Sequence, residues 1–93
     1  MVEPEFICKK MKEIRKQKKL TQKEVAKNMG ISRTMYAQLE CGAKKPNMEH
    51  ISTFSEYCGM LLSEFIRECE ELMQMEIFAE YNDIMQMDGS VND

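Results

Sequence analysis

Metal-binding and redox motifs are largely missing from this chain of 93 residues. It has one histidine, His50, and its four cysteines lie far apart without a C-x-x-C pair. Structural zinc sites need closely spaced cysteine and histidine ligands, so we predict no metal site. The cysteines are expected to be free thiols that fill apolar space, as is usual in a reducing compartment. They are Cys8, Cys41, Cys58 and Cys69.

Long apolar runs and catalytic motifs are also missing. No run approaches the roughly 18 apolar residues of a membrane span, and the N-terminus lacks the apolar centre of a signal peptide. We therefore expect a cytoplasmic protein without a membrane partner. No nucleophile elbow, phosphate-cradling glycine loop or carboxylate pair in an apolar setting is present, so we expect neither an enzyme nor a cofactor. His50 is interpreted as a residue on a helix face.

Positive charge is nearly absent from the second half of the chain. Residues 1–50 carry a formal charge of +6 and residues 51–93 a charge of −9, which the net charge of −3 conceals. The acidic half is unsuited to a DNA surface. The basic half is suited to nucleic acid if its cations coincide with a recognition motif.

The stretch TQKEVAKNMGISRTMYAQLE carries the motif around which the chain is organised. Thr21 and Glu24 form a capping box, in which each side chain satisfies the other residue's backbone N–H. Gly30 ends this first helix, because glycine adopts the left-handed conformation at little cost. Ser32 is a good N-cap for a second helix. The residues expected on the buried faces of the two helices are Val25, Ala26, Met29, Met35, Tyr36 and Leu39.

Two short helices joined by such a turn form a helix-turn-helix, whose second helix lies in the DNA major groove. The stretch from about Met11 to Phe65 resembles the phage-repressor/Cro-like helix-turn-helix family of bacterial transcription regulators, the Xre family. The resemblance rests on the run LTQKEVAKNMGISR, on LExG at residues 39–42, and on Cys58-Gly59-Met60 at the family's spacing. It implies an all-α, five-helix, lambda-repressor-like DNA-binding domain with an extended C-terminal helix, in a protein of bacterial or phage origin.

The pattern of apolar residues, caps and breakers predicts helices at about 5–17, 22–29, 33–40, 48–57 and 62–87. Asn47 is the expected cap of the fourth helix. The fifth helix lacks the polar cap that family members usually carry two residues after Gly59, because Leu61 stands there, and Ser63 is an alternative cap. We expect the DNA-binding domain at 1–66, a helical extension at 67–88 and a disordered tail at 89–93.

The exposed start of the second motif helix is expected to read bases. Arg33 can donate two hydrogen bonds to guanine, and Gln38 can pair with adenine, while methyl groups suit thymine. The predicted base-reading residues are Arg33, Thr34, Ala37 and Gln38. The family resemblance assigns a glutamine at the start of the first motif helix, and the loop after the second, to phosphates. The predicted phosphate-binding residues are Gln22, Ser32, Lys44 and Lys45.

Two roles stay open within this interface. Ser32 either caps its helix alone or also contacts DNA, and Tyr36 is a core residue whose hydroxyl could still lie at the phosphate backbone. The resemblance further implies an ion pair between Arg15 and Glu40, because many family members pair an arginine of the first helix with the glutamate of LExG. The alternative is that both are ordinary surface charges.

The last helix carries apolar residues at three- and four-residue steps beyond the usual end of the domain. A single helix does not stably expose such a stripe in water, so it should pack on its own domain or on a second copy, and we favour the second copy. A homodimer would suit a palindromic operator, because two half-sites need two recognition helices. The predicted dimer or partner interface comprises Cys69, Leu72, Met73, Ile77, Phe78, Tyr81, Ile84 and Met85.

Three functions are compatible with these features. The first is a sequence-specific regulator, most simply a repressor, that binds double-stranded DNA. The second is an antitoxin-type protein of the same fold, which binds a toxin through residues 62–88 and represses its own operon. The third is an interaction module that has lost DNA binding, against which the intact DNA-reading residues count.

Overall fold

The computed structural model describes residues 2–92, with side chains as far as Met85. Five helices follow one another, and the described residues contain no strand: α1 (Pro4–Gln17), α2 (Gln22–Met29), α3 (Arg33–Glu40), α4 (Met48–Tyr57) and α5 (Leu62–Asn92). The predicted all-α, five-helix fold with an extended C-terminal helix is confirmed. Helices α2, α3 and α4 have the predicted bounds. Helix α1 begins at Pro4 rather than Glu5, since the fixed φ of proline suits a first turn.

Local hydrogen bonds fix the two motif helices. Thr21 Oγ1 accepts the Glu24 N–H at 3.0 Å, and the Glu24 carboxylate accepts the Thr21 N–H at 3.1 Å. Gly30 ends α2 with a left-handed φ of 75°. Ser32 Oγ then accepts the Met35 N–H at 3.0 Å and caps α3. The turn that sets α3 against α2 is therefore specified by side chains that lie within it.

The starts of α4 and α5 differ from the prediction in two details. Asn47 caps α4 as expected, but His50 completes a capping box, because its Nδ1 accepts the Asn47 N–H at 3.2 Å. The sequence interpretation missed this role of His50. Helix α5 begins at Leu62, and the Glu64 carboxylate accepts the Leu61 N–H at 2.9 Å. Ser63 lies inside the helix and is not its cap, since this carboxylate supplies the missing acceptor.

Aromatic side chains from three helices form the centre of the core. The Tyr36 and Phe54 rings stack with centroids 6.5 Å apart, and Phe65 packs on Phe54 at 5.6 Å. Tyr36 is fully buried, so its hydroxyl does not lie at the phosphate backbone, and that alternative is wrong. Cys69 is also fully buried in this core. It was predicted at an interface, but its own domain covers it, and the packed region therefore extends past residue 66.

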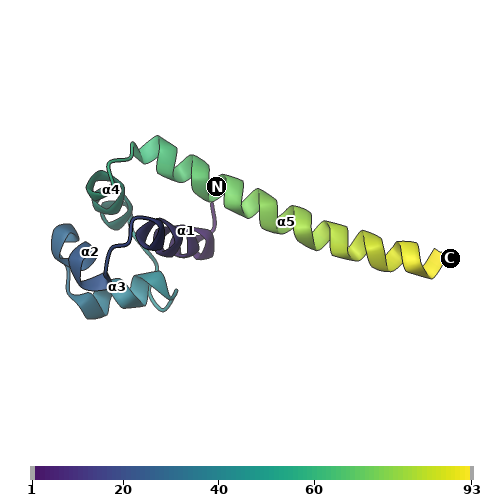
Figure 1. Ribbon diagram of the computed structural model, residues 1–93, viewed down its shortest axis with the longest axis horizontal. Helices are drawn as coiled ribbons and strands as arrows, with labels where there is room; N and C mark the ends of the chain where they lie inside the picture. Colours follow the sequence, from purple (N-terminus) through teal and green to yellow (C-terminus); the bar gives the residue numbers. More distant parts are fainter. Residues whose placement is uncertain (1, 93) are drawn as a thin grey trace.

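The part of α5 up to Glu76 forms ion pairs with α1, and the rest of the helix extends away from the domain (Figure 1). Lys9 Nζ lies 2.8 Å from a Glu76 oxygen, and Lys10 Nζ lies 3.5 Å from a Glu68 oxygen. The molecule is consequently elongated, with extents of 56 × 25 × 23 Å. The exposed large apolar residues after Met75 are Ile77, Phe78, Tyr81, Ile84 and Met85.

The end of α5 lies farther along the chain than predicted. Its backbone continues through Asn92, past the expected end at about Met87 and into the tail expected to be disordered at 89–93. A single glycine costs a helix only about 1 kcal/mol relative to alanine, so Gly89 need not end it. Asp93 lies outside the described residues. Over the part that the structure covers, no helix is both long and apolar enough to cross a membrane.

Candidate nucleic-acid interface

The start of α3 presents a polar face above a buried one. Arg33 and Thr34 are exposed, and Ala37 and Gln38 are half-buried on the same side of the helix. Tyr36 and Leu39 on the opposite side are fully buried. The four predicted base-reading residues therefore lie together, with Arg33 and Thr34 the most accessible.

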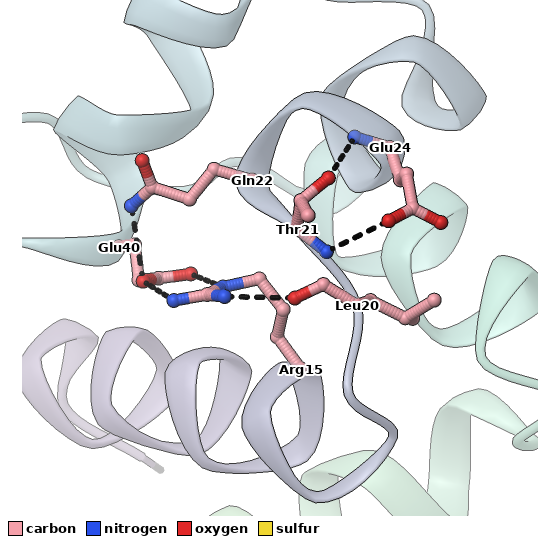
Figure 2. A network of polar contacts seen from close by, with 6 residues as sticks. All are labelled: Arg15, Leu20, Thr21, Gln22, Glu24 and Glu40. Atoms are coloured by element: carbon pink, nitrogen blue, oxygen red, sulfur yellow. Dashed lines mark hydrogen bonds and ion pairs between the residues drawn. The ribbon is translucent and has the colours of Figure 1, made fainter.

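A network of polar contacts lies between α1, α2 and the end of α3 (Figure 2). Arg15 Nε and Nη2 each donate a hydrogen bond of 2.8 Å to the Glu40 carboxylate. Arg15 Nη1 also donates to the Leu20 carbonyl at 2.9 Å. The Arg15 and Glu40 side chains are 13% and 3% exposed, so the pair is not an ordinary surface contact. It connects the end of α3 to α1 and to the turn before α2.

Gln22 belongs to the same network. Its Nε2 donates to Glu40 Oε1 at 3.2 Å, which uses one of the two N–H groups of the amide. The other N–H is available to an acceptor such as a phosphate oxygen. The sequence placed Gln22 correctly at the start of its helix, but it gave no sign of this contact, which crosses from α2 to the end of α3. Glu40 thus holds both Arg15 and Gln22.

Burial and hydrogen bonding act in opposite directions on Glu40. Burial by itself would raise the pKa of the carboxyl group, but hydrogen bonds, chiefly from Arg15, outweigh burial and hold the pKa below its ordinary value. Burial raises the pKa of Tyr36 far above its usual range, and the negative charge of the nearby Glu40 carboxylate raises it further. Among the described residues no partner completes a hydrogen bond with the Tyr36 hydroxyl. The Arg15–Glu40 ion pair therefore lies next to the buried side chains of the core, among them Tyr36.

Beside this network a shallow cationic notch opens to the surface. Its volume is about 540 Å³, and its walls are Arg15, Leu20, Thr21, Gln22, Lys23 and Arg33. The start of α2 borders the notch, and the N-terminus of a helix carries partial positive charge and N–H donors. Cations, amide donors and this helix end together suit a phosphate group. Arg33 belongs both to the wall of this notch and to the group of four predicted base-reading residues.

The loop after α3 places further cations close to that helix. Lys44 and Lys45 are exposed, and the Lys44 N–H donates to the Gln38 carbonyl at 3.1 Å. Gly42 has a φ of 86°, which lets the chain turn back toward α3. This hydrogen bond holds the loop beside α3, at the end of the helix opposite Arg33. Within the described part of the chain, no group of three His, Cys, Asp or Glu side chains is placed to hold a metal ion.

The chain matches a family model described as helix-turn-helix, HTH_3, over residues 11–65. The chain belongs to this helix-turn-helix family of transcriptional regulators. It is 32% identical over 89 residues to YqaE of Bacillus subtilis, an HTH-type transcriptional regulator, covering 89% of this chain and 77% of YqaE. It is 26% identical over 61 residues to RstR of Vibrio cholerae, a transcriptional repressor of the cryptic phage CTXphi. That match covers 66% of this chain and 55% of RstR.

Two solved structures of another protein have the same fold as this chain. The clp gene regulator ClgR from Corynebacterium glutamicum superposes with a TM-score of 0.77 at 20% identity, over 90% of this chain and 87% of ClgR. A second ClgR structure gives a TM-score of 0.69 at 21% identity, over 75% of this chain and 91% of that one. Identity at this level supports the fold alone. The family model and the two relatives confirm the predicted resemblance to the Xre family of helix-turn-helix regulators.

Proposed function

We propose that this protein is a sequence-specific DNA-binding transcriptional regulator of the cytoplasm, most simply a repressor, that binds a palindromic operator as a homodimer. The observation that carries the proposal is the position of the cationic notch beside the exposed start of α3. Helix α3 enters the major groove, and the notch and the loop lysines meet the two flanking phosphate backbones. This division suits the general pattern, in which phosphate contacts fix the register and base contacts supply the sequence preference.

The roles of individual side chains follow from their positions. Thr34, Ala37 and Gln38 face the bases, and Arg33 reaches guanine from the edge of the notch. Gln22 directs its remaining N–H to a phosphate, and Lys44 and Lys45 bind the backbone farther along. Ser32 Oγ already accepts the Met35 N–H, so any phosphate contact of Ser32 uses the hydroxyl as donor. The ion pair of Arg15 with Glu40 keeps α3 in place while these contacts form.

A dimer supplies the second recognition helix that an operator needs. The exposed apolar residues of α5 after Met75 are the surface we assign to it, because a lone helix gains nothing from exposing them. The same surface favours a second candidate function, an antitoxin-type regulator that binds a toxin there. The two candidates differ in whether a second protein encoded beside this one co-purifies with it at fixed stoichiometry.

Selection of bound duplexes from a random library tests the proposal, with the mass of the complex measured alongside. The expected result is a palindromic consensus with half-sites about 34 Å apart or a multiple of that distance, bound by two copies. Binding should weaken steeply as salt rises, because phosphate contacts release counterions. If the protein shows no salt-sensitive binding to duplexes, the proposal is wrong, and the protein is instead an interaction module that has lost DNA binding.

A further inference from the structure

A small apolar hollow lies where the start of α1, the start of α4 and the first turns of α5 meet. Its volume is about 190 Å³, and it is lined by Val2, Ile7, Met48, Ile51, Ile66 and Glu70. Met48 is 61% exposed in spite of its apolar side chain. The hollow borders α5, which lies on the opposite side of α1 from α3 (Figure 1). An occupant of this hollow would therefore leave the DNA-binding face free.

The distal part of α5 carries apolar side chains that could fill such a hollow but cannot reach the hollow of the same molecule. Phe78, Tyr81 and Ile84 on the distal part of α5 are 64%, 58% and 58% exposed. Helix α5 is continuous, so Tyr81 lies about 22 Å along the axis from Ile66 at 1.5 Å per residue. The distal stripe of one molecule can cover only the hollow of another.

We propose that two copies clasp each other, with their α5 helices antiparallel and crossing near Gln74, so that each distal stripe covers the hollow of the other copy. The inference rests on the proposed dimer and specifies its geometry. A two-fold interface uses the same patch on both subunits, so hollow and stripe are buried twice in one contact. Tyr81 is the anchor: its ring fills the hollow, and its hydroxyl donates to Glu70, the one charged residue among the six that line it.

The area available favours the clasp over pairing of the distal stripes alone. Stable interfaces bury about 800 Å² per partner. The five exposed side chains of the stripe present on the order of 500 Å², since aromatic residues bury about 150–250 Å² when fully covered and these are about half exposed. Adding the hollow, with its exposed Met48, brings the patch toward the required size.

The position of the hollow on α5 sets the antiparallel direction. Ile66 and Glu70 line the hollow, and the exposed stripe begins at Ile77, so the two surfaces lie on successive parts of one helix. An antiparallel pair places the stripe of each copy beside the Ile66 and Glu70 of the other. A parallel pair places stripe against stripe and leaves both hollows uncovered.

Cysteine cross-linking tests the direction of the helices. Cys41 is the one exposed thiol, so the variants are made with Cys41→Ser. Under mild oxidation the double variant Glu70→Cys/Tyr81→Cys should form disulfide-linked dimers, and neither single variant should. Cross-linking of Tyr81→Cys alone would overturn the clasp in favour of a parallel pair. A dimer that no pair cross-links would overturn it too, and a parent protein that is monomeric in sedimentation would remove the proposed dimer as well.

A second pair of variants tests the hollow without touching α5 in its distal part. Met48→Asp should weaken the dimer at least tenfold in sedimentation equilibrium, because Met48 lines the hollow. Leu61→Asp is the matched control, since Leu61 is 68% exposed but lies outside the hollow. It should change the dissociation constant by less than about twofold. Equal effects of the two variants, with unchanged helix content, would overturn the assignment of the hollow to the interface.

Discussion

Arg15 and Glu40 form a bidentate ion pair, in which Nε and Nη2 each lie 2.8 Å from a different carboxylate oxygen. The pair joins residues 25 positions apart in the sequence and connects the end of α3 to α1. Because both side chains are largely withdrawn from water, the loss of either leaves a charge without its partner. The pair is thus part of the packing that positions α3.

The first prediction concerns this pair. Arg15→Ala or Glu40→Ala should lower the free energy of unfolding by about 3–5 kcal/mol, because the remaining charge stays in a poorly hydrated site. Urea denaturation of the two variants and the parent measures the effect. Arg67→Ala is the control, since Arg67 lies 3.8 Å from Glu71 in an exposed contact and should change stability by less than about 0.5 kcal/mol. Equal stability of all four proteins would contradict the prediction.

The second prediction concerns the pH dependence of stability. Folding lowers the pKa of Glu40 below the value of about 4.3 for glutamate in an unfolded chain. The stabilisation is therefore fully present above about pH 4.3 and is lost as pH falls through the lowered pKa. The stability difference between the parent and Glu40→Gln should be largest at pH 7 and smaller at pH 3. Denaturation curves at both values provide the check, and a difference that grows toward low pH would show the opposite sign.

The third prediction separates base contacts from phosphate contacts. Arg33→Ala should cost about 1–3 kcal/mol of binding and relax the preference at one base pair. Lys45→Ala should weaken binding to all sequences alike and flatten the salt dependence. Both variants are measured by duplex selection and by titrations at several salt concentrations. Unchanged preferences in Arg33→Ala, together with a flatter salt dependence, would assign Arg33 to the phosphate notch instead.

The fourth prediction concerns the end of α1. Lys19 has a φ of 58°, the left-handed region that non-glycine residues adopt at a cost of about 1–2 kcal/mol. Lys19→Gly should raise the free energy of unfolding by about 0.5–1 kcal/mol, since the greater freedom of glycine in the unfolded chain offsets part of the gain. Lys18→Gly is the control, because Lys18 has a φ of −86° and gains nothing from glycine. Thermal melts in which Lys18→Gly is the more stable variant would contradict this account.

Much of the site was readable from the sequence because its signals are local. Thr21, Glu24, Gly30 and Ser32 act on backbone groups within three residues of themselves, so their identities set the bounds of α2 and α3 without knowledge of the rest of the fold. The pairing of Arg15 with Glu40 was expected from the resemblance alone. The notch was not foreseen, because its walls come from three helices.

The sequence by itself determined where the helices lie and which faces are apolar, since caps and periodicity act over one or two turns. Only the tertiary structure decided which apolar residues are covered. Cys69 is buried in the core, while Ile77 and Phe78 are exposed, although all three belong to the same apolar pattern of α5. Periodicity shows that a helix has an apolar face, but whether another element lies against that face depends on where the remaining helices pack.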